Sequence, residues 1–292
     1  MGYHPLQLTR LMLSGQRAPL TSSPADVGLE YEDVAFEAAD GVGLKGWFIP
    51  REEEGPGPVV LFVHGWLWNR AGNVAGHVPL EDRDVDFLPA VKALHDAGIS
   101  VLLFDLRWHG ESGDGKGPMT YGPSEASDLV GAVNYLRTRP AVDGERIGVI
   151  GTSMGGNIAL YGAPECQPIK AILAIQPTRL IVFNTNFART ELGRFGPLII
   201  KPIELLYAAR RAPRPSKHNP GIPARKLDNT LVKYVQGTGD QWGTMEVVEE
   251  FATVTPKVAG PVIRYPSVER YTGYLYISER VDDVVGFFSE NL

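Results

Sequence analysis

The chain has 292 residues, of which 43% are hydrophobic and 21% are charged, and its formal net charge is −6. This composition is typical of a soluble globular protein and lacks the basicity of a nucleic-acid-binding protein. A single cysteine, Cys166, excludes an intrachain disulfide and a metal site built from clustered cysteines. No apolar run is long enough to span a bilayer, and residues 1–20 lack the pattern of a secretory signal, so we expect a cytoplasmic protein.

The first segments with a clear pattern alternate apolar and polar residues. Residues 31–37 and 42–48 flank Asp40-Gly41, which predicts a hairpin of two half-exposed strands. Residues 1–30 form a lead-in to which we assign no chemistry. Residues 31–292 are expected to form one large α/β domain with an insertion, because this length can bury a full core.

Continuous apolar runs follow, and such runs form strands buried on both faces of a parallel sheet. Helices are predicted over residues 84–97 and 123–139, and residues 142–145 are typical of a turn. Strands that alternate with helices predict a parallel sheet covered on both faces, with ligand sites at the carboxyl ends of the strands. The predicted buried strands are residues 59–63, 100–104, 146–150, 169–175, 231–236 and 262–265.

The central strand ends in Gly151-Thr152-Ser153-Met154-Gly155, a G-x-S-x-G pattern. A buried strand followed directly by a helix leaves room for a very tight turn, and glycines keep Cβ atoms out of such a bend. Ser153 would lie at the apex, with the following amide at a helix N-terminus where negative charge is favoured. The alternative interpretation is a plain glycine- and serine-containing loop between a strand and a helix.

These motifs together resemble the α/β-hydrolase superfamily. The resemblance rests on His64-Gly65 after the strand at 59–63, on residues 105–112 and on the Ser153 turn. Residues 105–112 match the D-x-R-x-H-G-x-S stretch of the family, with Trp108 where glycine is usual. The resemblance implies an α/β-hydrolase fold, a mostly parallel eight-stranded sheet with helices on both faces and a cap insertion.

The resemblance also implies roles for individual residues. Ser153 would be the nucleophile, and the backbone amides of Trp66 and Met154 would form the oxyanion hole. His64 and His109 lie inside family motifs in which histidine commonly has a structural part. Asp240, just beyond the strand at 231–236, takes the position of the acid that orients the catalytic histidine. The alternative for Asp240 is an Asx-turn or a helix cap.

The expected histidine itself is missing, because no histidine follows Asp240 in the chain. Its position holds Arg270 or Tyr271, and neither is a ready base near pH 7, since arginine stays protonated and tyrosine titrates near about 10. Two explanations remain open. His77 or His218 reaches Ser153 from elsewhere in the fold, or the elbow and the oxyanion hole survive without an efficient base.

Residues 176–229 are too long for an ordinary loop and take the position of the cap in the family. The segment carries ten basic and three acidic residues, a formal charge of +7, together with several apolar residues. This pattern indicates either a helical lid with solvated cationic edges or a surface that attracts anions.

The sequence therefore predicts a serine hydrolase that acts on carboxylic esters or related acyl compounds, with activity in doubt because the histidine is absent. The alternative is a catalytically impaired α/β-hydrolase-fold protein that binds a small molecule or a partner. The expected partner is a small acyl substrate, with an anionic one suggested by the cap, and neither nucleic acid nor a membrane span is expected. No motif implies a cofactor or a metal ion.

Overall fold

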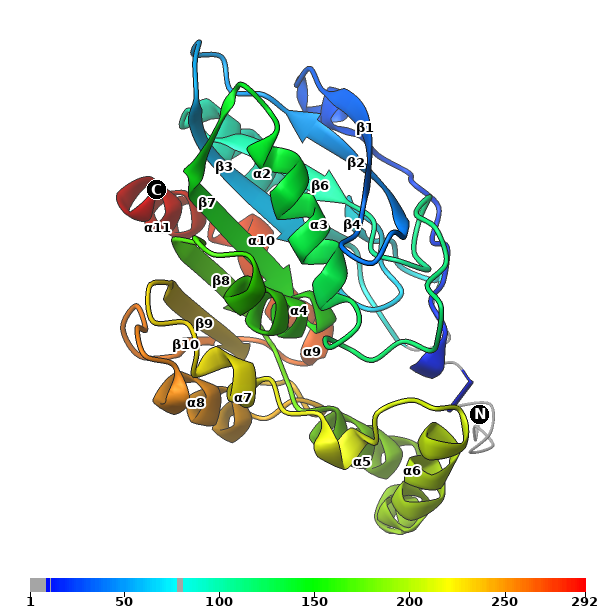
Figure 1. The fold of residues 1–292 in the computed structure, drawn as a ribbon. Helices are drawn as coiled ribbons and strands as arrows, with labels where there is room; N and C mark the ends of the chain where they lie inside the picture. The colour runs from blue at the N-terminus through cyan, green and yellow to red at the C-terminus, as the bar shows by residue number, and fades with distance from the viewer. Residues whose placement is uncertain (1–8, 11, 78–80) are drawn as a thin grey trace.

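A computed structural model describes residues 9–10, 12–77 and 81–292. Its centre is an eight-stranded sheet with the order β1-β2-β6-β3-β7-β8-β9-β10. β2 runs antiparallel to both of its neighbours, β1 and β6, and the other pairings in this sheet are parallel, so the sheet is mostly parallel, as predicted (Figure 1). The strands are β1 (Glu32–Glu37), β2 (Gly43–Ile49), β3 (Gly57–Val63), β6 (Ser100–Phe104), β7 (Val142–Thr152), β8 (Ala171–Ile175), β9 (Leu231–Gly237) and β10 (Ile263–Tyr265).

Burial along the strands follows their residue patterns. Every residue of β3, β6 and β8 is buried, which is what uninterrupted apolar runs require in the middle of a parallel sheet. The edge strand β1 instead leaves most of its residues partly or fully exposed. The apolar runs thus place the strongest hydrophobic core beneath the carboxyl ends of the central strands.

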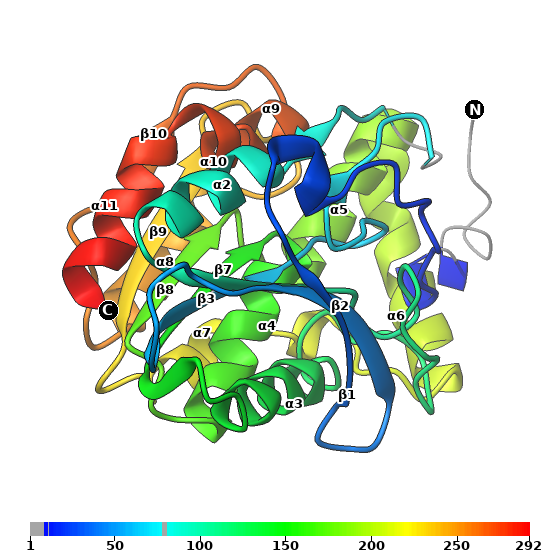
Figure 2. The same cartoon turned by 90° about the horizontal axis from the view of Figure 1, so that it is seen from above.

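Helices cover both faces of this sheet, as predicted. Figure 2 shows α2 (Leu88–Asp96) and α11 (Val281–Asn291) on one face, and α3 (Ala126–Arg137) and α4 (Met154–Gly162) on the other. Further helices outside the segment between β8 and β9 are η1 (Pro24–Val27), η2 (Ala163–Glu165), α8 (Met245–Val254), α9 (Arg270–Tyr274) and α10 (Tyr276–Glu279).

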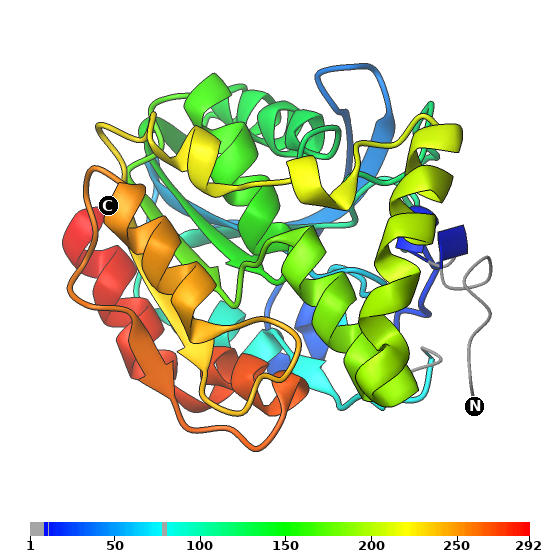
Figure 3. The ribbon, with the colours of Figure 1, turned by 90° about the horizontal axis from the view of Figure 1, so that it is seen from below.

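The segment between β8 and β9 is helical and lies beyond the carboxyl ends of the parallel strands. In Figures 1 and 3 its two longest helices lie together, apart from the sheet. Leu180, Phe183 and Thr178 of this segment line the same pocket as Ser153, so it contributes one wall of the site. Its helices are α5 (Leu180–Leu192), η3 (Gly193–Ile199), α6 (Ile200–Ala209), η4 (Pro215–Lys217) and α7 (Gly221–Ala224).

Two local predictions were wrong. The helix expected from residue 84 begins at Leu88, because Val85 pairs with Asn73 in the short sheet of β4 (Gly72–Asn73) and β5 (Val85–Asp86). Residues 142–145, expected as a turn, belong to β7, whose first residue Val142 pairs with Gly57 before an irregularity in the register. In both places a partner strand supplies hydrogen bonds that local sequence does not reveal.

Candidate active site

Ser153 lies at the apex of a strained turn between β7 and α4. Its backbone has φ 54° and ψ −116°, a conformation that non-glycine residues rarely adopt. A Cβ atom at Gly155 would fall 1.9 Å from the Val63 carbonyl oxygen, and one at Gly151 would fall 2.4 Å from the Gly155 carbonyl oxygen. The G-x-S-x-G spacing is therefore required by close backbone packing, and it lifts the Ser153 side chain above the sheet.

The two backbone amides predicted as oxyanion donors belong to Met154 and Trp66, which line the same pocket as Ser153. Met154 opens α4, and the first amides of a helix have no acceptor within the helix. The Trp66 amide has no hydrogen-bond partner among the described residues, although the next amide, that of Leu67, donates to His109 Nε2 at 3.1 Å. The loop after β3 is thus fixed by His109 and leaves the Trp66 amide available to a ligand.

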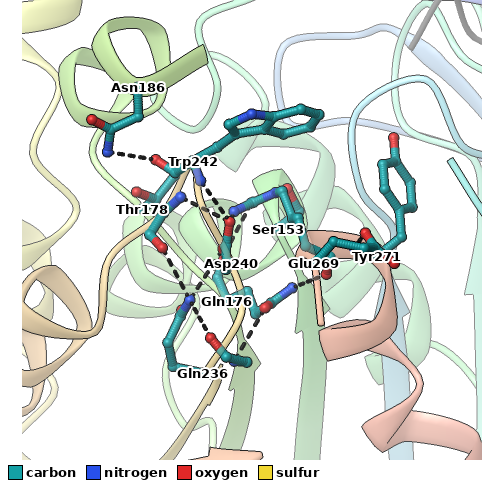
Figure 4. Close-up of polar contacts among 12 residues, drawn as sticks. Ser153, Gln176, Thr178, Asn186, Gln236, Asp240, Trp242, Glu269 and Tyr271 are labelled. Atoms are coloured by element: carbon teal, nitrogen blue, oxygen red, sulfur yellow. Dashed lines mark hydrogen bonds and ion pairs between the residues drawn. The ribbon is translucent and has the colours of Figure 1, made fainter. Parts of the chain in front are cut away.

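Arg270 connects Ser153 to Asp240. Its guanidinium donates from NH2 to Ser153 Oγ at 3.1 Å, and its NH1 forms an ion pair with Asp240 Oδ2 (Figure 4). The side chains of Arg270 and Asp240 are 4% and 0% exposed. Burial disfavours the charged guanidinium, but Asp240 and the adjacent tyrosines raise the pKa of Arg270 above its ordinary value. Arg270 is therefore a permanent donor in the position of the expected histidine.

Asp240 is held by four donors. Its Oδ1 accepts from the amides of Trp242 at 2.9 Å and Gly243 at 3.0 Å, and its Oδ2 accepts from Gln236 Nε2 at 3.1 Å and from Arg270. Figure 4 shows this cluster around the carboxylate. The Asp240 carboxylate forms the Asx-turn given as its alternative interpretation, and it also pairs with the Arg270 cation.

Gln176 positions Arg270 and had no role in the sequence interpretation. Its Nε2 donates to the Arg270 carbonyl at 2.9 Å, and its Oε1 accepts from the Gly237 amide at 3.1 Å. The Gln176 carbonyl also accepts from Arg270 NH2 at 3.4 Å. A polar residue directly after the apolar run of β8, at the carboxyl edge of the sheet, was the available signal.

The turn that carries Arg270 is also braced at its start. Glu269 is the N-cap of α9, and its carboxylate accepts from the amides of Tyr271 at 2.5 Å and Thr272 at 2.9 Å. Glu269 also pairs with Arg83 at 3.0 Å. Tyr271 lines the pocket, but the contacts with Ser153 and Asp240 come from Arg270. Of the two residues predicted for the histidine position, Arg270 is the one that contacts both Ser153 and Asp240.

Ser153 and Met154 line a small pocket that opens to the surface. The walls of the pocket are mostly aromatic. The lining residues include Trp66, Trp242, Phe183, Tyr274, Thr178 and Arg270.

Neither histidine proposed as a substitute base contacts Ser153. His218 is buried, with Nδ1 accepting from the Leu180 amide at 3.2 Å and Nε2 donating to the Tyr121 carbonyl at 2.9 Å. His77 is exposed and does not line the pocket. His218 has a structural position, since it ties the segment after α6 to two residues of the pocket wall.

His64 and His109 are structural as well. Each is fully buried, His64 Nε2 accepts from the Leu106 amide at 3.0 Å, and the two rings lie 5.1 Å apart. Burial lowers the pKa of His64 to about 4 and that of His109 to about 3, so both are neutral at physiological pH. The described hydrogen bond to Ser153 Oγ comes from Arg270, and the Tyr274 hydroxyl also lies beside Ser153.

The buried position of His218 predicts a pH-dependent contribution to stability. Burial lowers its pKa to about 4, so the unfolded chain binds a proton between pH 6.5 and 4 that the folded chain does not. The contribution of neutral His218 to the unfolding free energy is fully present above pH 6.5 and is lost as the pH falls toward 4. Between pH 7 and pH 5, the unfolding free energy of wild type should fall by about 2 kcal/mol more than that of His218→Gln. The reason is that one additional bound proton in the unfolded chain changes this free energy by about 1.4 kcal/mol per pH unit. Urea unfolding of both proteins measures this, and equal losses would contradict it.

The described part of the chain contains no group of three or more His, Cys, Asp or Glu side chains that could hold a metal ion. Within the same residues, no helix has the length and apolarity needed to cross a membrane.

Comparison with known proteins places this geometry in a family. The profile of the alpha/beta hydrolase family matches residues 60–283. YfhR of Salmonella typhi is 35% identical over 143 residues, which cover 47% of this chain and 42% of that protein. Thiohydrolase aneE of Aspergillus aculeatus is 30% identical over 194 residues, which cover 66% of this chain and 55% of that protein. The alignments thus span about half the length of these relatives.

The fold comparison covers nearly the whole chain. The Pyrococcus furiosus esterase Pf2001 superposes with a TM-score of 0.70 and 26% sequence identity, covering 96% of this chain and 98% of that one. The family profile, the order of the eight strands and the turn at Ser153 agree with one another. The chain belongs to the alpha/beta hydrolase family.

Proposed function

We propose that this protein is a slow serine hydrolase that cleaves carboxylic esters and thioesters with good leaving groups. The observation that carries the proposal is Ser153 in its strained turn, beside two amides and within an aromatic pocket. Such amides stabilise the oxyanion that forms when a serine oxygen attacks a carbonyl. The names of the relatives, an esterase and a thiohydrolase, support the same chemistry.

Arg270 determines which substrates can react. A histidine base would take the serine proton and return it to the leaving group, whereas a guanidinium has no lone pair available for a proton. The proton of Ser153 must instead pass to hydroxide or water. The resulting alkoxide forms a bond to the acyl carbon, and the leaving group departs as an anion. Thiolates and phenolates leave readily in this form, while simple alkoxides do not.

The second half of the reaction meets the same obstacle. Water must attack the acyl-serine ester without a base, so hydrolysis of this intermediate is slow. The two amides still stabilise the second oxyanion, and such a site retains about 10³- to 10⁴-fold acceleration over water when a triad member is missing. We therefore expect an acyl group to accumulate on Ser153 during turnover.

The test is burst kinetics with p-nitrophenyl acetate. Wild type should release close to one equivalent of nitrophenolate rapidly and then turn over slowly, and intact-protein mass spectrometry should find one acetyl group. Ser153→Ala should show no burst and should react at nearly the solution rate, while the exposed Ser216→Ala control should match wild type. A burst that persists in Ser153→Ala would overturn the nucleophile assignment.

A second candidate function is ligand binding without turnover. It is favoured by one observation, the buried Arg270 between Ser153 and Asp240, which lacks the proton affinity that catalysis requires of this position. The two candidates separate in the same experiment. Acylation of Ser153 supports slow hydrolysis, and complete absence of acylation with retained ligand binding supports the second function.

A further inference from the structure

The pocket around Ser153 presents donors that have no acceptor. Arginine has no free lone pair, so in the Arg270–Ser153 hydrogen bond the serine oxygen is the acceptor. The Ser153 hydroxyl therefore keeps its proton for donation, either to the Tyr274 oxygen beside it or to a ligand. The Trp66 amide also has no partner among the described residues, and the Met154 amide opens a helix.

Two buried hydroxyls add to this set. Tyr274 is 1% exposed and Thr178 is 6% exposed, and both line the pocket. Neither Tyr274 OH nor Thr178 Oγ1 makes a hydrogen bond of standard geometry, although Ser153 and Gln176 lie beside Tyr274 OH. Burial raises the pKa of Tyr274 to about 12, so its hydroxyl keeps its proton at neutral pH. Buried polar groups without partners are uncommon and costly, and here they gather in one cavity.

The charged side chain among the described lining residues is a cation. Arg270 is a lining residue, and the described lining residues include no aspartate or glutamate. Asp240 is completely buried and accepts four hydrogen bonds, two of them from backbone amides, so its charge is compensated from several directions. The pocket thus offers one cation and several neutral donors.

We propose that this pocket binds a monocarboxylic acid with a compact aromatic or apolar tail. The carboxylate lies between Arg270, Tyr274 OH and the two amides, replaces Ser153 Oγ as an acceptor of Arg270, and receives the Ser153 proton as a hydrogen bond. The tail contacts Trp242 and Phe183. The inference rests on the proposed function, because such an acid is also the product of the proposed hydrolysis.

The walls favour a carboxylate over a phosphate. Phe183 and Tyr274 stack on the Arg270 guanidinium, at 5.3 Å and 5.4 Å from its central carbon to the ring centroids. This leaves a narrow polar face enclosed by rings, which suits a planar group with one negative charge. A phosphate dianion would need a second cation, and the described lining residues supply none.

The test compares phenylacetate with phenylacetamide, a neutral molecule of nearly the same shape. Binding is followed by tryptophan fluorescence, since Trp66 and Trp242 line the pocket, and by calorimetry. Hydrogen bonds to a charged group are worth about 1.5–3 kcal/mol, so phenylacetate should bind about 10- to 100-fold more tightly. Equal affinities at low salt, or equally tight binding of inorganic phosphate at the same site, would overturn the proposal.

Substitutions identify the side chains that recognise the carboxylate. Arg270→Gln should remove the preference for the acid and keep the affinity for the amide, and the exposed Arg225→Gln control has the same change in net charge with no expected effect. If Arg270→Gln fails to fold, Tyr274→Phe serves instead. It should weaken the binding of phenylacetate by about 5- to 10-fold, the effect of one hydrogen bond, and leave the binding of phenylacetamide unchanged. All binding measurements are repeated with the Ser153→Ala variant, which cannot be acylated at this position. If Ser153→Ala still prefers phenylacetate and wild type shows no burst, the proposed hydrolase activity is rejected and the proposed carboxylic acid site is supported.

Discussion

Ester hydrolysis by the Arg270→His variant should exceed that of wild type by about 100-fold at pH 8. General base catalysis contributes about 10²- to 10⁴-fold, and the lower end applies because an imidazole is shorter than the arginine side chain that now reaches Ser153. Asp240 already accepts a hydrogen bond from residue 270, so it can orient the new histidine as it now orients the guanidinium. The measurement is the steady-state hydrolysis of p-nitrophenyl acetate.

The pH profile separates a restored base from a general change in the pocket. Wild-type activity should rise about tenfold per pH unit between pH 6 and 9, because the reactive alkoxide is formed without a base. The Arg270→His profile should level off above about pH 6.5, the ordinary pKa of histidine. A gain without this plateau would mean that the histidine does not act as the base.

Two further variants complete this experiment. Tyr271→His introduces histidine next to position 270, at a residue without a contact to Asp240 among the described interactions, and it should give no gain. The double variant Ser153→Ala with Arg270→His should lose the gain entirely. A gain in Tyr271→His equal to that in Arg270→His would show that the residue at 271 reaches Ser153.

Replacing Arg107 with methionine should lower the unfolding free energy by about 3–5 kcal/mol. Arg107 is 2% exposed and pairs with Asp128, which is 0% exposed, at 2.7 Å, and with Asp40 at 2.8 Å. Its backbone amide also donates to Asp128 at 3.0 Å. Removing the cation leaves a buried carboxylate with one amide donor, and an uncompensated buried charge of this kind carries that cost. Urea unfolding gives the measurement.

A surface ion pair provides the comparison. Lys92 pairs with Asp96 on an exposed helix face, and Lys92→Met should lower the unfolding free energy far less than Arg107→Met, because water screens exposed ion pairs. The loss in Arg107→Met should also grow as the pH rises above about 7, where wild-type Asp128 releases its proton and the variant keeps it. Burial raises the pKa of Asp128 to about 7 with Arg107 present, and loss of the cation raises it further. The folded variant then keeps a proton that the unfolded chain releases. A loss similar to that of Lys92→Met would contradict the argument.

Much of this fold follows from local pattern. The apolar runs at 59–63, 100–104 and 169–175 can be buried only in a doubly covered sheet, and the structure places all three in its centre. The glycines around Ser153 predict a tight turn, and the backbone packing requires them, because a Cβ atom at Gly151 or Gly155 would overlap neighbouring carbonyl groups. The absence of a histidine after Asp240 is likewise a fact of the sequence.

Some assignments depended on contacts between distant segments. The choice between Arg270 and Tyr271 is made by the α9 cap at Glu269 and by Gln176, which lies more than ninety residues away in the chain. His218 could be a base by residue type alone, but both of its ring nitrogens are occupied by backbone groups of Leu180 and Tyr121. Hydrogen bonds of this range leave no periodic signal in a sequence.

Residue type and local spacing were sufficient to predict the alternation of strands and helices, the turn at Ser153, the position of Asp240 and the lack of a histidine. Only the folded chain shows that the cation of Arg270 lies between Ser153 and Asp240 and that unpaired donors gather around it. Their convergence depends on the relative positions of β7, β8, β9 and α9, because these elements are distant in sequence and meet only through tertiary packing.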